Sequence, residues 1–418
     1  MDNQKLVVVM VGLPARGKTH VARKLSRYLS WLGYRTRLFN VGSYRRARLG
    51  PGQSAEFFDP TNESANEARR AISAEALEDV LAFVGREGRV GIFDATNTTR
   101  DKRALVERRC RAAGFDVLFV ELVCDDPIVI EVNVRATKTL SQDYEGVDPE
   151  QATRDFRARI EQYERVYEPL DESDGRFVKV MDLGQTVVAH RIHGYLESRI
   201  VAFLLASRPT RRVVWLSRHG ESRFNSQGRI GGDSELTSAG QLYAENLSRF
   251  VAQHSDADAP PLVLTSTLRR TIQTAEPIPY PKTALRALDE LNAGVCDGLT
   301  YAQIVERYPN EYTSRAEDKL RYRYPGGESY EDVIQRLESV IWEIERSVRP
   351  VLVVAHQAVN RALYAYFMDW SPEVCPHLDA PLHTVLELSP QPYGCEERRY
   401  PLGPLAPRGQ PLLGGRQR

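Results

Sequence analysis

The chain has 418 residues, of which 42% are hydrophobic and 27% charged, and this composition excludes a disordered or low-complexity protein. Because one hydrophobic core rarely serves so long a chain, the length predicts two domains. Lys plus Arg equals Asp plus Glu at 56 each, so the net charge gives no general attraction for nucleic acid or for a membrane surface.

The cysteines and the N-terminus indicate the compartment. The five cysteines stand far apart, at positions 110, 124, 296, 375 and 395, and match neither a disulfide framework nor a zinc site. The first apolar run, from Leu6 to Leu13, is much shorter than the roughly 20 residues of a membrane-spanning helix, and no small-residue cleavage site follows it. A cytoplasmic protein without a signal peptide is therefore expected.

The first half of the chain alternates short β-branched runs with longer amphipathic stretches. Strands are predicted at 6–11, 36–41, 89–96 and 116–124, with helix-like stretches between them. This alternation predicts βαβ units and a parallel sheet. An amphipathic stretch over 187–204 leads into the sequence SRPT, so a domain boundary is expected near residue 208.

The second half repeats this α/β alternation. Strands are predicted at 213–218, 261–265 and 351–355, and a helix is predicted over 330–346, where apolar residues recur at three- and four-residue spacing. Four prolines and four glycines fall after residue 399, without an apolar period. The expected organisation is therefore one domain over 1–208, a second over 209–396, and a Pro- and Gly-rich tail over 397–418.

A nucleotide site is predicted at residues 12–19, which read GLPARGKT between the first strand and a helix. This sequence fits G-x4-G-K-[ST], in which glycines turn backbone N–H groups toward phosphate oxygens at a helix N-terminus. Lys18 reaches the outer phosphates and Thr19 can bind Mg²⁺. The position of the motif favours nucleotide binding over an ordinary Gly-rich turn.

Asp94, at the end of the strand that runs into FDATNTT, is a second candidate Mg²⁺ ligand, although a strand-end Asp can also be a turn or N-cap residue. A phosphorylated second substrate would need further cations. The candidates are Arg45, Arg46, Arg69, Lys138 and Arg159, and spacing alone does not distinguish them from solvated surface charges.

A second site is predicted where residues 216–222 read LSRHGES at the carboxyl end of a strand. Ligands of open α/β sheets bind at that edge. His219 can attack phosphorus as a neutral imidazole, and Arg218 can bind the phosphoryl oxygens. The pattern therefore favours a histidine nucleophile.

His356 ends another predicted strand, so the two histidines can converge. Arg270 and Glu290 complete a possible phosphate clamp and proton donor. One histidine alone would more often be a core or surface imidazole, but the pair beside Arg218 favours covalent phosphohistidine chemistry. No metal-binding cluster accompanies these residues, so no metal is expected in this domain.

The motifs together resemble the 6-phosphofructo-2-kinase/fructose-2,6-bisphosphatase family from about residue 5 to about residue 396. In the first half the matching segments are GLPARGKT, GSYRR, EFFDPTN, FDATNTT and KTLSQDY. In the second half they are RHGES, GRIGGDS, RRTIQTAE, YRYPGGESYED, HQAV and PLHTVL. The resemblance implies an α/β P-loop kinase domain and a phosphoglycerate mutase-like histidine phosphatase domain. It also implies that two copies of the chain form a homodimer.

This resemblance also implies the chemistry of the kinase domain. The domain would transfer the γ-phosphoryl group of ATP to the 2-hydroxyl of fructose 6-phosphate. The residues implied for ATP and Mg²⁺ are Gly12, Gly17, Lys18, Thr19, Asp94 and, at the adenine, Asn133. The residues implied for fructose 6-phosphate are Arg46, Arg69, Thr96, Arg159 and Tyr163, with Lys138 at the transfer site.

The phosphatase domain would hydrolyse fructose 2,6-bisphosphate at the 2-phosphate. The resemblance makes His219 the nucleophile, Glu290 the acid and His356 a stabilising partner. It implies substrate contacts from Arg218, Asn225, Gly231, Arg270, Tyr301, Arg315, Lys319, Tyr330, Gln357 and Arg361. The chain departs from the usual family residues at Gln142, Ala158 and Asp289, none of which is assigned a chemical role.

Three other interpretations stay open at this point. Only one of the two domains could turn over appreciably, although Lys18 and His219 are both present. The two pockets could belong to a sensor or scaffold, but a sensor needs neither a nucleophile nor a proton donor. A kinase and phosphatase fusion could act in nucleic-acid end repair, against which the balanced charge counts.

Overall fold

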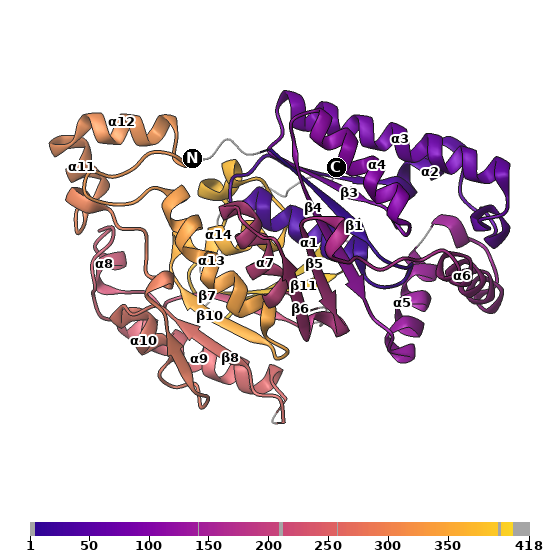
Figure 1. Cartoon of the computed structure of the whole chain (residues 1–418). Coiled ribbons are helices and arrows are strands. Elements are labelled where there is room, and N and C mark those ends of the chain that lie inside the picture. The colour runs from indigo at the N-terminus through magenta and orange to yellow at the C-terminus, as the bar shows by residue number, and fades with distance from the viewer. Residues whose placement is uncertain (1–4, 141, 209–211, 257, 392–393, 404–418) are drawn as a thin grey trace. The chain divides into compact units, whose positions relative to one another are not determined.

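The computed structural model describes residues 5–140, 142–208, 212–256, 258–391 and 394–403, with the backbone alone for 136–140. The chain divides into two compact units, Met1–Pro209 and Thr210–Arg418. Each unit contains a six-stranded sheet with helices around it (Figure 1). The predicted α/β class is thus confirmed for both halves.

The sheet of the N-terminal unit has the strand order β2-β3-β1-β4-β5-β6. Its first five strands run parallel, and β6 pairs antiparallel with β5. The strands are β1 (Leu6–Val11), β2 (Thr36–Asn40), β3 (Val90–Asp94), β4 (Asp116–Val123), β5 (Phe177–Met181) and β6 (Thr186–His190). All six residues of β1 are buried, as expected for a central parallel strand.

Seven α-helices are described in this unit. They are α1 (Lys18–Trp31), α2 (Val41–Leu49), α3 (Glu63–Arg86), α4 (Arg100–Ala112), α5 (Pro127–Leu140), α6 (Pro149–Glu164) and α7 (Tyr195–Ala206). Short 3-10 turns lie at Ala55–Phe58, Gln142–Tyr144, Glu172–Asp174 and Asp182–Gly184. The amphipathic stretch expected over 187–204 is divided between β6 and α7, because Arg191 takes a left-handed conformation (φ 54°) that ends the strand.

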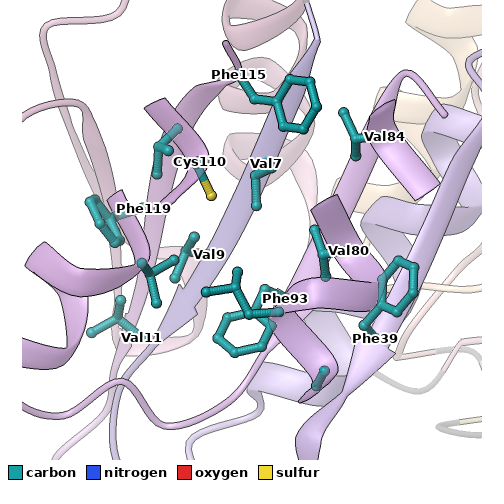
Figure 2. Packing of buried hydrophobic residues seen from close by; sticks show 14 of the residues in the cluster. Val7, Val9, Val11, Phe39, Val80, Val84, Phe93, Cys110, Phe115 and Phe119 are labelled. Carbon is teal, nitrogen blue, oxygen red and sulfur yellow. The ribbon is translucent and has the colours of Figure 1, made fainter. Parts of the chain in front are cut away.

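The core of this unit lies between the sheet and helix α3. Figure 2 shows Val80 and Val84 of α3 beside Phe93 and Val7 of the sheet. Helix α3 packs so closely that a Cβ at Gly91 would lie 2.7 Å from Cγ1 of Val80. The sheet and the helix therefore fix each other's position, and with it the carboxyl ends of β1 and β3.

In the C-terminal unit the strand order is β12-β11-β7-β10-β8-β9. Strands β7, β10, β8 and β9 are parallel, whereas β11 is antiparallel to both of its neighbours. Their bounds are β7 (Val214–Arg218), β8 (Leu262–Thr265), β9 (Lys282–Ala284), β10 (Val351–Ala355), β11 (Thr384–Gln391) and β12 (Gly394–Pro401).

Strand β12 changes the expected start of the C-terminal tail. Residues 397–401, predicted to begin the tail, pair with β11 instead, and Tyr400 packs against Phe250 with ring centroids 4.9 Å apart. An edge strand with one exposed face needs no continuous apolar run, which is why composition did not reveal it. The rest of the predicted tail, from residue 404, lies outside the described residues.

The helices of the C-terminal unit surround this sheet. They are α8 (Arg223–Ser226), α9 (Ser238–His254), α10 (Arg269–Ala275), α11 (Tyr301–Arg307), α12 (Pro309–Glu317), α13 (Tyr330–Arg346) and α14 (Gln357–Phe367), with 3-10 turns at Arg286–Leu288, Gly294–Cys296 and Pro372–His377. Helix α13 has the predicted bounds and begins with a capping box between Ser329 and Asp332. No helix in the described parts of either unit is long and apolar enough to cross a membrane.

The packing of Phe93 leads to a first prediction. Its ring is fully buried in the core against α3, so Phe93→Ala is expected to lower the free energy of unfolding by about 3–5 kcal/mol, and Phe93→Leu by about 1 kcal/mol. Hydrogen exchange of peptides from β1 and β3 measures the change within this unit. Exchange rates that stay equal in wild type and Phe93→Ala would contradict the assigned core.

Candidate active sites

The turn between β1 and α1 has the backbone shape of a phosphate-binding loop. Gly12 has φ 130°, and a Cβ at this position would lie 2.6 Å from the carbonyl oxygen of Leu122. Gly17 has φ 84° and immediately precedes the first turn of α1. Both positions thus require glycine, and the free N–H groups of α1 begin where a phosphate would bind.

Lys18 is buried at the start of α1, where its Nζ donates to the carbonyl oxygen of Leu13 (2.5 Å). Burial lowers the pKa of this ammonium to about 8, although Asp94 acts in the opposite direction. An anionic phosphate beside Lys18 would restore its ordinary pKa. The group therefore fits the outer phosphates of a nucleotide.

Thr19 and Asp94 form a pair of oxygen ligands at the same edge of the sheet. The Thr19 hydroxyl donates to Oδ2 of Asp94 (2.7 Å), and Nδ2 of Asn40 donates to the same oxygen (2.6 Å). Burial raises the pKa of Asp94, which means that the carboxylate is short of a balancing positive charge. A hydroxyl and a carboxylate are hard ligands of the kind that Mg²⁺ uses, so the predicted metal residues fit that ion.

Asn133 and Thr96 flank the phosphate-binding loop. Nδ2 of Asn133, on α5, donates to the carbonyl oxygen of Ala15 (2.9 Å), and the backbone N–H of Gly12 donates to the carbonyl oxygen of Thr96 (3.0 Å). Both residues predicted from the family resemblance thus contact the loop. Lys138 also belongs to α5, but its side chain lies outside the described residues.

The predicted sugar-phosphate residues gather around one aromatic ring, Phe58. The guanidinium carbons of Arg159 and Arg69 lie 3.7 and 5.9 Å from the ring centroid, and the Tyr163 ring lies 5.9 Å away. Arg45 lies 5.3 Å from the same centroid. Phe58 was not predicted from the sequence, because its neighbours come from three separate helices, α2, α3 and α6.

Arg46 joins this cluster through a shared carboxylate. Its Nη1 lies 3.5 Å from Oδ2 of Asp143, and Arg45 forms a buried ion pair with the same oxygen. Burial, with the nearby charge of Arg159, lowers the pKa of Arg45. Arg45, Arg46, Arg69 and Arg159 are therefore linked through Phe58 and Asp143, and this gathering of guanidinium groups favours an anionic ligand.

In the C-terminal unit the predicted residues converge on a cavity of about 160 Å³. Every residue predicted for this site except His356 lines it, namely Arg218, His219, Asn225, Gly231, Arg270, Glu290, Tyr301, Arg315, Lys319, Tyr330, Gln357 and Arg361. Sequence reasoning missed Ser222, Arg229, Ile230, Leu291, Ala293, Tyr322, Tyr324 and Ala358. Several of the missed residues lie inside the matching motifs, yet their spacing does not show which way they face.

His219 is held with a defined proton position. It follows β7, and its Nδ1 lies 2.7 Å from the carbonyl oxygen of Gly220. Because a carbonyl oxygen only accepts, Nδ1 carries the proton and Nε2 keeps its lone pair. Burial, together with the charges of Arg270 and Arg218, lowers the pKa of His219 well below 6.5. The imidazole is therefore neutral and nucleophilic near neutral pH.

His356 lies behind His219, with ring centroids 5.1 Å apart, and is fully buried. Its Nε2 is 2.7 Å from the Ser266 hydroxyl, which also accepts from the backbone N–H of Leu268 (3.1 Å). Nδ1 of His356 is buried without a hydrogen-bond partner. Burial and the neighbouring charge of Arg270 lower the pKa of this imidazole well below 6.5 as well.

Two arginines approach His219. Arg218 donates from Nη1 to the carbonyl oxygen of Ala380 (3.0 Å), while its Nε is buried without a partner, and burial lowers its pKa to about 10. Arg270 donates to the carbonyl oxygen of Gly232 (2.5 Å). The turn is tight here, since a Cβ at Gly231 would lie 1.7 Å from Oδ1 of Asp297.

Glu290 has both carboxylate oxygens fixed. Oε2 accepts from the backbone N–H of Gln357 (3.1 Å), and Oε1 accepts from the N–H groups of Ala358 (3.2 Å) and Leu291 (3.0 Å). The first turn of α14 thus holds this carboxyl group at the wall of the cavity. A proton donor at this position would face the same space as His219.

Cations also line the part of the cavity formed by α12 and α14. Arg361 donates to the Tyr330 hydroxyl (3.2 Å), and Nη2 of Arg315 lies 3.4 Å from the Tyr301 hydroxyl. The pKa of Lys319 is lowered by burial and by the charges of Arg315 and Arg361. These cations come from segments other than those of Arg218 and Arg270, so two groups of cations line the cavity.

Comparison with known proteins gives a family for each half of the chain. The 6-phosphofructo-2-kinase family model matches residues 1–211, and the model of the histidine phosphatase superfamily (branch 1) matches residues 214–401. A 6-phosphofructo-2-kinase/fructose-2,6-bisphosphatase of Gallus gallus is 49% identical over 398 residues, which cover 94% of this chain and 84% of that protein. The chain belongs to the 6-phosphofructo-2-kinase/fructose-2,6-bisphosphatase family.

Other members of the family show the same similarity. Form 4 of Rattus norvegicus is 48% identical over 400 residues, covering 95% of this chain and 85% of that protein. The protein of Arabidopsis thaliana is 48% identical over 411 residues, which cover 96% of this chain but 54% of that protein. The chain is accordingly a bifunctional enzyme, an ATP-dependent kinase and a phosphatase that make and degrade fructose 2,6-bisphosphate.

The buried histidines predict how stability depends on pH. Unfolding exposes His219 and His356 and returns each pKa to its usual value near 6.5, so below that pH the unfolded state binds protons that the folded state excludes. The free energy of unfolding is expected to fall as the pH drops through 6.5, by up to about 1.4 kcal/mol per pH unit for each histidine. Urea unfolding at a series of pH values measures this slope.

Other groups also titrate in this range, so a variant must isolate the histidines. His356→Gln removes one of them and keeps a polar side chain, and its stability is expected to depend less steeply on pH than that of the wild type. A wild-type slope that the substitution leaves unchanged would show that His356 does not carry the effect.

Proposed function

We propose that the N-terminal unit transfers the γ-phosphoryl group of ATP to the 2-hydroxyl of fructose 6-phosphate between the phosphate-binding loop and the Phe58 cluster. The N–H groups at Gly17 and the start of α1 bind the nucleotide phosphates. Lys18 neutralises charge on the transferred group. Arg159 and Arg69 hold the 6-phosphate and the sugar, with Arg46, Thr96 and Tyr163 completing the contacts. Positioning and charge supply most of the rate in such a transfer.

Thr19 and Asp94 would hold Mg²⁺ in this site. The ion supplies charge neutralisation at the nucleotide phosphates when it is bound. Asn40 fixes the orientation of Asp94 through their hydrogen bond. Asn133 beside Ala15 would contact the adenine, and Lys138 on α5 would act near the transferred group, both by analogy with the family.

We infer that the C-terminal unit hydrolyses fructose 2,6-bisphosphate through a phosphohistidine, and the proton position on His219 carries this proposal. The lone pair on Nε2 attacks the phosphorus of the 2-phosphoryl group and forms an N–P bond. The bond from phosphorus to the sugar oxygen breaks, and Glu290 gives that oxygen its proton. Water then attacks phosphorus, the N–P bond breaks, and Glu290 takes back a proton as inorganic phosphate forms.

The two groups of cations in the cavity bind different parts of the substrate. Arg218, Arg270 and Asn225 hold the reacting phosphate, and His356, which packs against His219, supports the nucleophile as charge develops. Arg315, Lys319, Arg361, Tyr301, Tyr330 and Gln357 hold the sugar and its 6-phosphate. Binding at a remote phosphate orients the reacting one, which turns binding free energy into rate.

Because the two activities have separate sites, a substitution in one site should lower only one activity. Lys18→Met removes the charge at the nucleotide phosphates and is expected to lower kinase turnover by at least about 100-fold while hydrolysis stays within about twofold of wild type. His219→Ala removes the nucleophile and is expected to lower hydrolysis by about 1,000-fold or more and to leave the kinase unchanged. Both activities are measured on the purified full-length variants.

A labelling experiment tests the covalent step. Substrate with a radiolabelled 2-phosphoryl group should leave an acid-labile label on the wild-type chain and none on His219→Ala. If one of the two substitutions silenced both activities in a folded protein, the assignment of two sites would be wrong. If no label were trapped on rapid quenching, direct attack by water would replace the phosphohistidine.

We infer from the family likeness that the chain forms a homodimer and acts in the cytoplasm. Light scattering on the purified protein is expected to give twice the 47.3 kDa of one chain. A mass that stays at the monomer value when the protein concentration is raised tenfold would contradict the dimer.

A further inference from the structure

Glu290 lies in a segment that has no regular secondary structure. The segment runs from the 3-10 turn at Arg286–Leu288 to the one at Gly294–Cys296, and residues 289–293 between them form neither helix nor strand. A proton donor must nevertheless stay within hydrogen-bond reach of one leaving-group oxygen. Because no ladder of backbone hydrogen bonds fixes this segment, other groups have to hold it.

Arg336, on α13, is bonded to this segment at three carbonyl groups. Its Nη1 donates to the carbonyl oxygen of Ala287 (2.5 Å), and its Nη2 donates to those of Asp289 (2.7 Å) and Glu290 (3.3 Å). The guanidinium group thus binds the backbone at Glu290 and at two residues that precede it. A lysine ammonium, which lacks the planar fork of nitrogens, could not make this set of contacts.

Glu328 connects the same guanidinium to the far end of the segment. Arg336 donates from Nε and Nη2 to the two carboxylate oxygens of Glu328 (2.8 and 3.1 Å). Glu328 in turn accepts from the backbone N–H of Asn292 (3.0 Å) and donates its own N–H to the Asn292 carbonyl (2.9 Å). The segment is therefore held on both sides of Glu290, from Ala287 to Asn292, by one ion pair.

We propose that Arg336 is a positioning residue for the phosphatase reaction, which holds the backbone of Glu290 so that its carboxyl group meets the oxygen of the departing sugar. Arg336 does not line the cavity, so it does not bind substrate. This inference rests on the proposed role of Glu290 as the acid. The side chain of Glu290 is fixed by α14, and its backbone is fixed by α13 through Arg336.

The leaving group distinguishes this role from general support of the fold. A sugar oxygen leaves poorly without a proton, so its departure depends on a well-placed acid. A p-nitrophenolate ion leaves without protonation. Both substrates still need His219, His356 and the two arginines beside them, so damage to the nucleophile site would slow both reactions alike.

The experiment compares fructose 2,6-bisphosphate with p-nitrophenyl phosphate on five proteins: wild type, Arg336→Met, Arg336→Lys, Glu290→Gln and Arg346→Met. Arg346 is the matched control, since it is an exposed arginine on the same helix and pairs with Glu343 at the surface. For Arg336→Met we expect kcat with fructose 2,6-bisphosphate to fall by about 100-fold, with KM changed by less than about threefold. Turnover of p-nitrophenyl phosphate should stay within about threefold of wild type.

Glu290→Gln should show the same selective loss, and Arg346→Met should show none. Arg336→Lys keeps the positive charge but not the planar guanidinium group. Its kcat should fall about tenfold with fructose 2,6-bisphosphate and should not fall with p-nitrophenyl phosphate. If Glu290→Gln is selective but Arg336→Met slows both substrates equally or neither, the positioning role is overturned and the acid assignment stands. If Glu290→Gln itself is not selective, the acid assignment fails and the positioning role fails with it.

Discussion

Burial of positive charge at the carboxyl ends of parallel strands is the constraint on which both sites depend. Lys18 is buried and Arg218 is half-buried, and the loss of solvent lowers the pKa of Lys18 to about 8 and that of Arg218 to about 10. Loss of water disfavours the charged form of each side chain, and a bound phosphate would favour it again. Because these cations are already partly removed from water, an anion that binds beside them gains more binding free energy than it would at a solvated cation.

The cores keep this arrangement from relaxing. In the N-terminal unit the close contact between Gly91 and α3 fixes the sheet, so the loop after β1 and Asp94 at the end of β3 meet at one edge. In the C-terminal unit β7 and β10 are neighbours in register, with Ala355 opposite Arg218. His219 and His356 follow these two strands directly, which is why their rings come within 5.1 Å of each other.

The parts of the fold that sequence predicted best have a continuous or a periodic apolar pattern. Strand β1 and strand β10 read as continuous apolar runs, and α13 repeats its apolar residues along one face, so their bounds match the structure. Strands at or near sheet edges, such as β9 and β12, carry polar residues because one face or one side meets solvent, and they were not predicted. Their pairing depends on distant segments and not on local pattern.

The candidate sites divide in the same way. Residues that end a strand or directly follow one, such as Asp94 and His219, could be expected to lie at a common edge, since the parallel strands of each sheet end there. Phe58, Tyr322 and Arg336 come from irregular segments or helix faces, and their contacts exist only after the chain has folded. Arginine is common at surfaces, so sequence alone gives no reason to single out Arg336.

Each half of the chain has its own sheet and its own hydrophobic core, with a phosphate site built on each. Substitutions that weaken one core need not disturb catalysis in the other. Substitutions in one unit can therefore change the rate of synthesis or of hydrolysis alone, and so change the steady-state level of fructose 2,6-bisphosphate. A chain with one common core would have lacked that freedom.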